Sequence, residues 1–455
     1  MGQSLSLFSK MKKNDRITAK CEDYTYDGMG IVKHQGFCVF VRNMIIGEVA
    51  EIVITKVGKD YGYGKVLKST ETSSERVQPM CDVYPRCGGC QIQHFSYTHQ
   101  KEFKRNIVQH NLTHIGKLDV VVNDVLGMEE PWKYRNKVQV PIQFDDNDNP
   151  IMGFYRVNSH DVIPFTHCAI QSDVSNELIN YIRDLFIEHK AGNEFRHIML
   201  RTHASTNEIM VVFVTNQKEV SILDYIVKSI VEKFSNVCSV IQNINSERTN
   251  VVLGKEEIVL YGKEYIVDYM NGFEFHTASK SFYQVNSIQT KLLYETAIEL
   301  AQIDKESKVV DVYCGVGTIT MFLAQRAKEV IGIEIVAQAV ENARENAKRN
   351  NLDNIEFMLG DAKTCTKKLV EDNTSIDVAV IDPPRKGCDV NTLEALVELS
   401  PKRIVYVSCN PATLARDLRF LEDNGYKTEV VQPVDMFPQS YHVETVCVIS
   451  KMDTK

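Results

Sequence analysis

The chain has 455 residues, of which 44% are hydrophobic, so it is long enough to form two or three domains with separate cores. Its formal charge of -8 excludes a surface that is basic all over, although local clusters of Lys and Arg could still bind nucleic acid. No segment approaches the roughly 18 to 20 apolar residues of a membrane helix, and residues 1–4 begin no secretion signal. We expect a cytoplasmic protein without a membrane partner, and by default a monomer.

Residues 10–69 alternate apolar and polar side chains between glycines, which predicts a small OB-like β-barrel. Within residues 10–68, eleven Lys and Arg stand against seven Asp and Glu, a net charge of +4. This contrast with the negative whole chain is typical of a barrel that contacts RNA. A solvated barrel without a partner fits the charge equally well.

A loop with three closely spaced cysteines follows. Cys81, Cys87 and Cys90 form the pattern C-x5-C-x2-C, and the chain has twelve cysteines in all. Because cytosolic thiols stay reduced, this spacing predicts a metal site rather than disulfides. Zinc and iron–sulfur clusters both accept such thiolates, so the spacing leaves the metal open.

Residues 70–275 read as a central α+β domain that includes these cysteines. A helix is expected at 97–113, and the helical part near 95–120 is expected to pack on the catalytic domain. Further helices are predicted at 174–190 and 219–234, and strands at 138–142, 209–214, 239–243 and 257–260.

Residues 276–455 alternate strands and helices regularly, which indicates a doubly wound, Rossmann-like parallel sheet. The predicted strands are 308–312, 329–333, 355–359, 378–381 and 403–407, and the predicted helices are 288–301, 318–326 and 337–350. Ligands of such sheets bind beyond the carboxyl ends of the strands. The whole chain is therefore predicted to be a multidomain α/β protein with a catalytic C-terminal domain.

A glycine-rich turn, Asp311-Val312-Tyr313-Cys314-Gly315-Val316-Gly317, follows the first of these strands. Its glycines let the backbone approach a nucleotide closely. A dinucleotide site would need Gly where this chain has Thr320, which weakens an NAD interpretation. Glu334 ends the second strand, where its carboxylate can accept hydrogen bonds from both ribose hydroxyls. A single adenosyl ligand is therefore favoured.

Two more strand ends carry acids. Asp361 ends the third strand, where it can accept a hydrogen bond from an adenine amino group. The motif Asp382-Pro383-Pro384-Arg385 ends the fourth. Its prolines cannot join a sheet ladder, so they end the strand and fix a loop that faces both cofactor and substrate.

The motif Ser408-Cys409-Asn410-Pro411 follows the strand 403–407, so its thiol lies at the same edge as those acids. Asn410 and Pro411 are turn and helix-start residues, which argues against a core cysteine. A thiolate can add reversibly to C6 of a pyrimidine, and C5 then becomes nucleophilic enough to take a methyl group from a sulfonium. Cys409 is the predicted nucleophile.

The proton on C5 must leave before the thiol can be eliminated, so a general base is required. His442 and Glu444, before the apolar strand 446–449, are the candidates. Their spacing does not separate them, and we favour Glu444.

Together these residues resemble the RNA uracil-5-methyltransferase family over nearly the whole chain. Family members carry Phe-x-Gln-x-Asn, present here at residues 282–286, and the resemblance implies that Gln284 contacts S-adenosylmethionine. It also supports Tyr313, Glu334, Asp361 and Asp382 as cofactor residues, Cys409 as nucleophile and Glu444 as base. The family often differs from this chain at Thr318 and at Asp361.

The branch that modifies ribosomal RNA is similar in two further features, an N-terminal barrel called TRAM and a four-cysteine iron–sulfur site. Residues 10–69 look like TRAM. The resemblance implies Cys168 as the fourth ligand and favours a structural [4Fe-4S] cluster over zinc. The implied activity is methylation of uridine C5 in 23S ribosomal RNA, with the base flipped out of a single-stranded loop.

Two alternatives stay open. A transfer RNA uracil-5-methyltransferase would share every catalytic residue. A non-catalytic, redox-responsive RNA-binding protein would use the loop 81–90 as its sensor, although the candidates at both Cys409 and Glu444 argue against it. RNA contacts are expected from the barrel, the cysteine loop and the cationic segment 101–105.

Overall fold

The computed structural model describes residues 11–247 and 249–452. The chain forms two compact units: the first holds the residues up to Phe103 together with Pro438–Tyr441, and the second holds Lys104–Phe437 and the residues from His442 onwards. The predicted division into three domains is finer than this and stays a prediction. None of the helices in the described ranges has the length and apolar character needed to cross a membrane.

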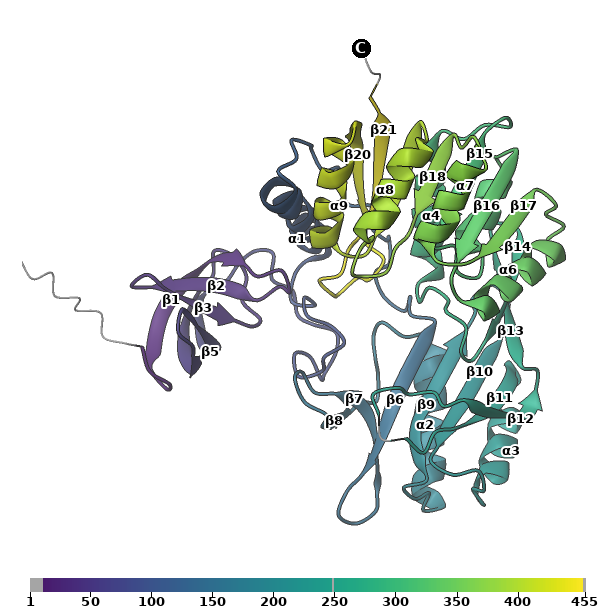
Figure 1. Cartoon of the computed structure of the whole chain (residues 1–455). Coiled ribbons are helices and arrows are strands. Elements are labelled where there is room, and N and C mark those ends of the chain that lie inside the picture. Colours follow the sequence, from purple (N-terminus) through teal and green to yellow (C-terminus); the bar gives the residue numbers. More distant parts are fainter. Residues whose placement is uncertain (1–10, 248, 453–455) are drawn as a thin grey trace, which may run out of the picture. The chain divides into compact units, whose positions relative to one another are not determined.

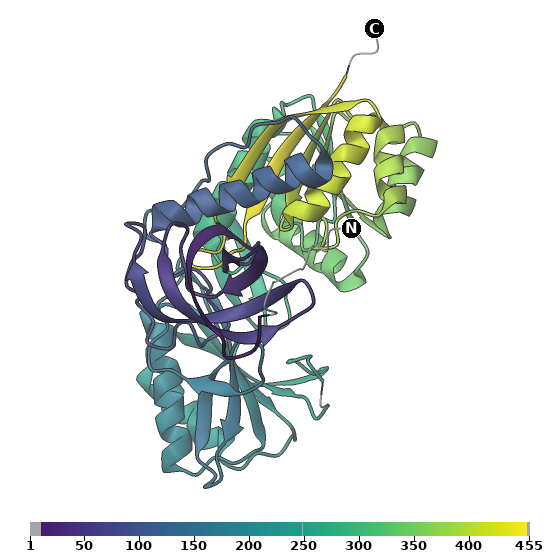
Figure 2. The same ribbon diagram turned by 90° about the vertical axis from the view of Figure 1, so that its left-hand side faces the viewer.

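The first unit contains a closed barrel with strand order β1-β2-β3-β5-β4 (Figures 1 and 2). The strands are β1 Arg16–Tyr24, β2 Gly30–His34, β3 Phe37–Val41, β4 Val49–Val57 and β5 Tyr61–Glu71. Alternate side chains such as Val39 and Ile52 fill its interior, as the period of two predicts. Gly64 is required at a crowded point, since a Cβ there would lie 2.4 Å from the Ile52 side chain. The predicted small barrel is confirmed.

Helix α1, Tyr97–Asn111, continues into a π-helical turn, Leu112–Gly116. The predicted helix 97–113 therefore ends within two residues of the observed α-helix. Within the second unit, the apolar side chains of Val108 and Leu112 are fully buried in one core with residues of the C-terminal sheet, which spans residues 308–451.

The second unit begins with a seven-stranded sheet of order β12-β11-β10-β9-β6-β7-β8. Its strands are β6 Lys137–Phe144, β7 Pro150–Tyr155, β8 Val162–Pro164, β9 Phe195–Thr202, β10 Ile209–Thr215, β11 Val237–Ile244 and β12 Glu256–Gly262, with helices α2 Asp173–Glu188 and α3 Leu223–Lys233 and the hairpin β13 Tyr265–Met270 and β14 Phe273–Ala278. β10 is buried along its whole length, which explains its continuous apolar sequence. α3 begins four residues after its predicted start at 219, because residues 221 and 222 form a turn first.

The catalytic sheet has the order β17-β16-β15-β18-β19-β21-β20. Its strands are β15 Lys308–Val312, β16 Glu329–Glu334, β17 Ile355–Leu359, β18 Val378–Ile381, β19 Arg403–Ser408, β20 Tyr426–Val434 and β21 Glu444–Lys451. Its helices are α4 Ser287–Ala301, α5 Thr318–Ala324, α6 Ala337–Arg349, α7 Ala362–Glu371, α8 Val390–Leu399 and α9 Pro411–Asp423. The five strands predicted from the sequence are present within one residue of their expected ends.

The sheet is not parallel throughout, in contrast to the prediction. β15 to β19 are parallel, but β21 runs antiparallel between β19 and β20. Because β20 and β21 are joined by a loop rather than a crossover helix, the second must run back along the first.

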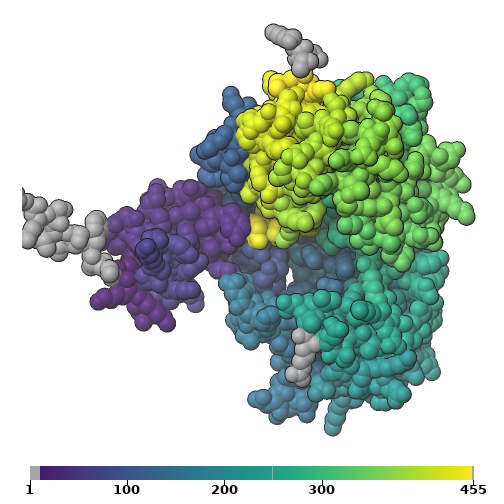
Figure 3. Space-filling model, viewed as in Figure 1, coloured from purple at the N-terminus to yellow at the C-terminus, as the bar shows by residue number. Residues whose placement is uncertain are grey.

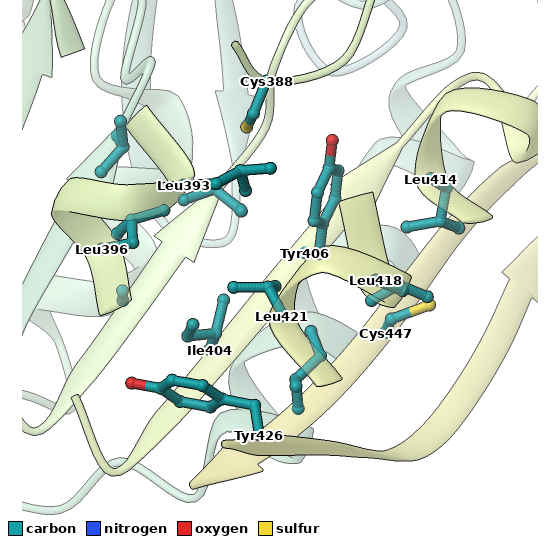
Figure 4. Close-up of a cluster of buried hydrophobic side chains, with 14 of the residues drawn as sticks. Cys388, Leu393, Leu396, Ile404, Tyr406, Leu414, Leu418, Leu421, Tyr426 and Cys447 are labelled. Carbon is teal, nitrogen blue, oxygen red and sulfur yellow. The ribbon is translucent and has the colours of Figure 1, made fainter. Parts of the chain in front are cut away.

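Two apolar cores hold the catalytic sheet. One lies under α7, α8 and α9, where Tyr406 and Leu414 are fully buried (Figure 4). The other lies under α4 and α5 and includes Leu293 and Phe322. In Figure 1, α8 and α9 lie in front of the strands of the catalytic sheet, and in Figure 3 the yellow and green atoms of this region hide the strands from view. Because helices cover both faces of the sheet, a ligand can reach it only at the ends of its strands.

Candidate active site

A pocket of about 730 Å³ opens beyond the carboxyl ends of the central strands of the catalytic sheet. All seven cofactor and catalytic residues predicted from the sequence line it, namely Gln284, Tyr313, Glu334, Asp361, Asp382, Cys409 and Glu444. Five of them follow parallel strands or begin the helices after them. The parallel register therefore brings together residues far apart in the sequence.

The glycine-rich turn closes around the end of β15. The backbone N–H groups of Tyr313 and Cys314 both donate to the Ile333 carbonyl, at 3.0 and 2.9 Å. Tyr313, Gly315 and Gly317 all have positive φ angles, and only glycine adopts these freely. The backbone of the turn is therefore open to a ligand. Tyr313 lines the pocket with a positive φ, a conformation that is unfavourable for a residue with a side chain.

Glu334 is fixed by this turn. Its carboxylate accepts hydrogen bonds from the N–H of Gly315 at 3.1 Å and of Val336 at 2.8 Å. Each carboxylate oxygen has a further lone pair for a ribose hydroxyl. The geometry therefore suits the predicted ribose contact.

Asp361 has a structural role of its own as the N-cap of α7. Its side chain accepts from the Thr364 N–H at 2.9 Å, and these bonds to Thr364 hold the pKa of the carboxyl below its usual range. The residue is exposed at the pocket edge. A second lone pair leaves room for the predicted adenine contact.

The Phe-x-Gln-x-Asn segment is held from two sides. The Asn136 side chain donates to the Gln284 carbonyl at 3.0 Å, and its backbone N–H donates to the Val285 carbonyl at 2.9 Å. Asn286 caps α4 and donates to the Met436 carbonyl at 3.0 Å. The Asn of this motif therefore ties the cofactor segment to the loop before Glu444.

Three buried carboxyls lie at or behind the pocket floor. Burial raises the pKa of Asp311 to about 7, of Asp382 to about 7 and of Glu444 to about 8. The Thr320 hydroxyl donates to Asp311 at 2.5 Å. This hydrogen bond explains why Thr320 stands at the position where a dinucleotide site would have glycine: its hydroxyl is a partner for the buried Asp311. Such a group of acids favours a cationic ligand.

Cys409 lies half-buried between β19 and α9. Asn410 caps α9 and donates to the Arg385 carbonyl at 2.9 Å, which joins the cysteine to the Asp382 loop. Burial, followed by the negative charges of Glu444 and Asp382, raises the pKa of the Cys409 thiol to about 11, and Arg385 opposes this. The thiolate therefore needs additional positive charge in the pocket.

His442 and Glu444 both face the pocket, but their environments differ. Burial, then the charges of Arg385 and Lys104, lowers the pKa of His442 to about 4. This leaves a neutral imidazole that is a weak base. The raised pKa of Glu444 makes its carboxylate, once ionised, a stronger base than the neutral His442 imidazole.

Two residues near the pocket were missed by the sequence reasoning. Asp311 was noted in the turn but not as part of the acid group, and its apolar strand was the available signal for burial. Tyr294 lines the pocket from α4, and burial raises its pKa above the usual range. In the sequence, Tyr294 stands in an apolar helical segment, which does not indicate a ligand site.

The cationic segment 101–105 does not behave as one RNA surface. Lys104 is fully buried and forms an ion pair with Asp435, so the expectation that it contacts RNA is wrong. Arg105 forms an ion pair with Asp124 at 3.1 Å. The helical spacing put the buried and exposed cations on different faces.

The predicted metal ligands fall into different compact units. Cys81, Cys87 and Cys90 belong to the first and Cys168 to the second, and all four are half-buried. Within the described ranges, no three His, Cys, Asp or Glu side chains converge as metal ligands. The predicted iron–sulfur site is therefore not confirmed by the structure.

The catalytic sheet, with its glycine-rich turn, acidic second strand end and antiparallel last hairpin, defines an S-adenosylmethionine-dependent methyltransferase. The model of the family described as tRNA (Uracil-5-)-methyltransferase matches residues 96–452. The chain belongs to this family of uracil-5 RNA methyltransferases, as its motifs predicted.

Similar proteins agree over the full length. An uncharacterised RNA methyltransferase of Oceanobacillus iheyensis is 47% identical over 446 residues, which cover 96% of either chain. One of Clostridium tetani is 45% identical, with 97% of either chain covered. Among solved structures, the tRNA (uracil-54, C5)-methyltransferase of Pyrococcus abyssi bound to S-adenosyl-L-homocysteine has a TM-score of 0.74 and 26% identity, with 95% of this chain and 99% of that one covered. The protein is thus an RNA methyltransferase that uses S-adenosylmethionine.

Proposed function

We propose that the protein methylates C5 of uridine in 23S ribosomal RNA, with Cys409 as nucleophile and Glu444 as general base. One observation carries the catalytic part. In the antiparallel pair of β19 and β21, Ser408 lies opposite Thr445, so the next positions, 409 and 444, face each other at the pocket. The nucleophile and the base can therefore reach neighbouring carbons of one ring.

The proposed reaction has three steps in which bonds and protons balance. The Cys409 thiolate forms a bond to C6, and the electron pair of the C5–C6 double bond moves towards C5 and the O4 carbonyl. C5 then forms a bond to the methyl carbon of S-adenosylmethionine while the bond between that carbon and sulfur breaks, and S-adenosyl-L-homocysteine is the leaving group. Glu444 removes the proton from C5, the C5–C6 double bond returns, and the Cys409 thiolate leaves.

The charges in the pocket fit this sequence of steps. Arg385 is the cation that lowers the pKa of both Cys409 and Glu444, so it favours the ionised form of each. Gln284, Tyr313, Glu334, Asp361 and Asp382 are the proposed cofactor residues. The positive charge of a bound methyl donor would lower the pKa of the three buried acids and of the Cys409 thiol, and so favour their ionised forms.

The catalytic roles are tested with two variants and a matched control. We expect Cys409→Ala to abolish methylation. We expect Glu444→Gln to accumulate a protein–RNA adduct that survives denaturing electrophoresis, because the thiolate cannot leave before the C5 proton does. The control Cys238→Ala changes a half-buried cysteine of the central sheet and should leave the rate unchanged. Appreciable turnover by Cys409→Ala would refute the covalent route.

The absence of an adduct with Glu444→Gln, together with retained activity, would transfer the role of base to His442 or water. We therefore include Glu444→Gln/Cys409→Ala, in which any adduct must disappear. An adduct that persists in this double variant would identify another nucleophile.

The proposed RNA surface includes the barrel. The rings of Phe40, Tyr61 and Tyr63 form a cluster on its outer face, with centroids 5.1 to 5.8 Å apart. Lys65 follows Tyr63 on the same face of β5, because alternate residues of a strand share a face. Unpaired bases stack on such rings with about 1–3 kcal/mol per base. This supports a TRAM-type role for residues 10–69.

The choice of ribosomal over transfer RNA rests on the resemblance to the ribosomal RNA branch, and it needs a direct comparison because the transfer RNA methyltransferase of Pyrococcus abyssi matches 95% of this chain. Purified large-subunit RNA and transfer RNA, unmodified at uridine C5, should be offered side by side with labelled S-adenosylmethionine. We expect 5-methyluridine in 23S RNA only. Methylation of transfer RNA alone would replace this proposal with the transfer RNA activity.

We also propose a structural [4Fe-4S] cluster held by Cys81, Cys87, Cys90 and Cys168. The donor set is suitable: two hydrogen-bonded turns fold the segment between Cys81 and Cys87, and the Gly89 N–H donates to the Cys87 sulfur at 3.3 Å. Cluster sulfurs are commonly stabilised by such N–H groups. Anaerobically purified protein should be brown with about four irons per chain. Colourless protein with one zinc would overturn the assignment.

A further inference from the structure

A buried polar cluster within the second unit contacts the Phe-x-Gln-x-Asn segment, residues 282–286, which leads into α4. Its central member is Asp268 on β13, which is 2% exposed and lies outside the set of residues that line the pocket. A carboxyl is costly to bury unless its oxygens are hydrogen-bonded. The role of Asp268 therefore depends on which groups it binds.

Asp268 accepts hydrogen bonds at both carboxylate oxygens. Oδ1 accepts from the Ser205 hydroxyl and from the Tyr269 backbone N–H at 3.0 Å, and Oδ2 accepts from the Tyr283 hydroxyl at 2.7 Å. The His203 Nδ1 atom lies 3.3 Å from Oδ2. Burial acts to raise the pKa of Asp268, but the neighbouring His203 and the two hydroxyls outweigh it and hold the pKa below its usual range. The carboxyl is therefore an ionised acceptor.

The bond from Tyr283 fixes the middle of the segment. Tyr283 stands between Phe282 and Gln284, which both line the pocket, and its ring packs in the apolar core under α4 and α5. A hydrogen bond to a carboxylate is shorter and stronger than one between neutral groups. Because consecutive Cα atoms are held at a fixed distance, any shift of Tyr283 moves Gln284 as well.

The same cluster reaches the start of α4. The Ser287 hydroxyl donates to Asp268 Oδ2 at 3.4 Å and accepts from the Asn136 side chain at 3.0 Å. Asn136 also binds the Gln284 and Val285 carbonyls, as described above. Side chains from earlier in the chain therefore hold the segment at its middle and at its end.

We propose that Asp268 is a positioning residue for the cofactor site: through the Tyr283 hydroxyl it fixes the backbone from which Gln284 reaches S-adenosylmethionine. This inference rests on the proposed function of Gln284 as a cofactor residue. Without the bond the segment takes several shapes, and the cofactor must select the one that binds. If that shape is populated about one tenth of the time, the apparent Kd rises about tenfold.

The test measures the affinity of the full-length protein for S-adenosyl-L-homocysteine by isothermal titration calorimetry. Asp268→Asn keeps the volume of the side chain but removes its charge and one acceptor oxygen, and Tyr283→Phe removes only the hydroxyl. We expect both variants to raise the Kd, and the KM for S-adenosylmethionine, about tenfold, while kcat at saturating cofactor stays within about twofold.

Tyr269→Phe is the matched control. It also loses a hydroxyl that donates to a carboxylate, that of Glu274 at 3.2 Å, but Tyr269 is exposed and lies outside the pocket. Its Kd should equal that of wild type.

Combination with Gln284→Ala tests whether Asp268 acts through this side chain. Asp268→Asn/Gln284→Ala should bind no more weakly than Gln284→Ala alone, because no Gln284 amide is left to position. Losses that multiply in the double variant would overturn the proposal, and so would a wild-type Kd in Tyr283→Phe. A purely structural role would lower the folded fraction, and with it kcat, at an unchanged Kd, which would also overturn it. If Asp268→Asn does not fold, Tyr283→Phe replaces it in each comparison.

Failure of the proposed function has a different signature. Gln284→Ala would then bind S-adenosyl-L-homocysteine as tightly as wild type, and the positioning role would fall with it. If Gln284→Ala weakens binding while Asp268→Asn and Tyr283→Phe do not, only the positioning role is refuted.

Discussion

Replacing Glu444 by Gln should stabilise the free protein, even though it removes the proposed base. Burial raises the pKa of this carboxyl from 4.5 to about 8. A carboxyl whose pKa is raised on folding contributes its full share of stability below the unfolded pKa, and that share is lost as the pH rises through the folded pKa. Wild-type protein therefore loses stability from about pH 4.5 to pH 8, whereas the amide does not titrate.

The magnitude follows from the same two pKa values. Keeping the carboxyl protonated in the folded state while the unfolded chain ionises costs about 1 kcal/mol at pH 5 and about 3 kcal/mol at pH 7. With an unfolding entropy of about 2 cal/mol/K per residue and a unit of roughly 350 residues, these energies correspond to about 1 °C and about 4 °C in Tm. Glu444→Gln should therefore melt higher than wild type, by an amount that grows with pH.

Thermal unfolding of the ligand-free protein from pH 5 to pH 8.5 measures this difference. Glu429→Gln is the matched control, because Glu429 is exposed on the neighbouring strand β20, and it should leave Tm unchanged at every pH. A gain in Tm that is the same at pH 5 and pH 7, or a variant less stable than wild type, would refute the reasoning from burial.

Three further outcomes follow from the buried polar groups. Thr320→Val removes the hydrogen bond to Asp311 and should lower the stability by about 1–3 kcal/mol in denaturant titration, and an unchanged midpoint would count against that bond. Lys104→Met removes the ammonium that binds the buried Asp435 carboxylate and should cost about 3–5 kcal/mol, most of which Lys104→Met/Asp435→Leu should restore; equal losses in both variants would contradict the ion pair. Alkylation of Cys409 by iodoacetamide in the ligand-free protein should accelerate with pH up to about 11, as its raised pKa requires, and a plateau near pH 8 would contradict it.

The parallel strands of the catalytic domain were predictable because each is a short, continuously apolar run between turn residues. Lys308–Val312 and Val378–Ile381 match their predicted bounds in full. The same regularity placed the strand-end residues Glu334 and Asp382 at one edge. What the pattern could not reveal was the antiparallel β21, because strand order is decided by pairing between distant segments.

Properties that depend on the surroundings of a side chain were also beyond the sequence. His442 and Glu444 lie two residues apart before the apolar part of the last strand, and their burial and neighbouring charges, which the sequence does not reveal, give them different pKa values. Lys104 is one of several cations on a helix with a polar surface, and nothing local indicates that it lies against Asp435. The contact between Lys104 and Asp435 joins segments more than 300 positions apart in the chain.

The position of β21 also bears on how the protein is made. This strand is the last of the sheet to be synthesised, yet it lies between β19 and β20 rather than at an edge. A nascent chain that has emerged only as far as residue 443 carries Cys409 but lacks the strand that would cover one side of β19. Cys409 and Glu444 therefore come together only when β21 has paired with β19 and β20, so an incomplete chain has a nucleophile but no base to release a captured RNA.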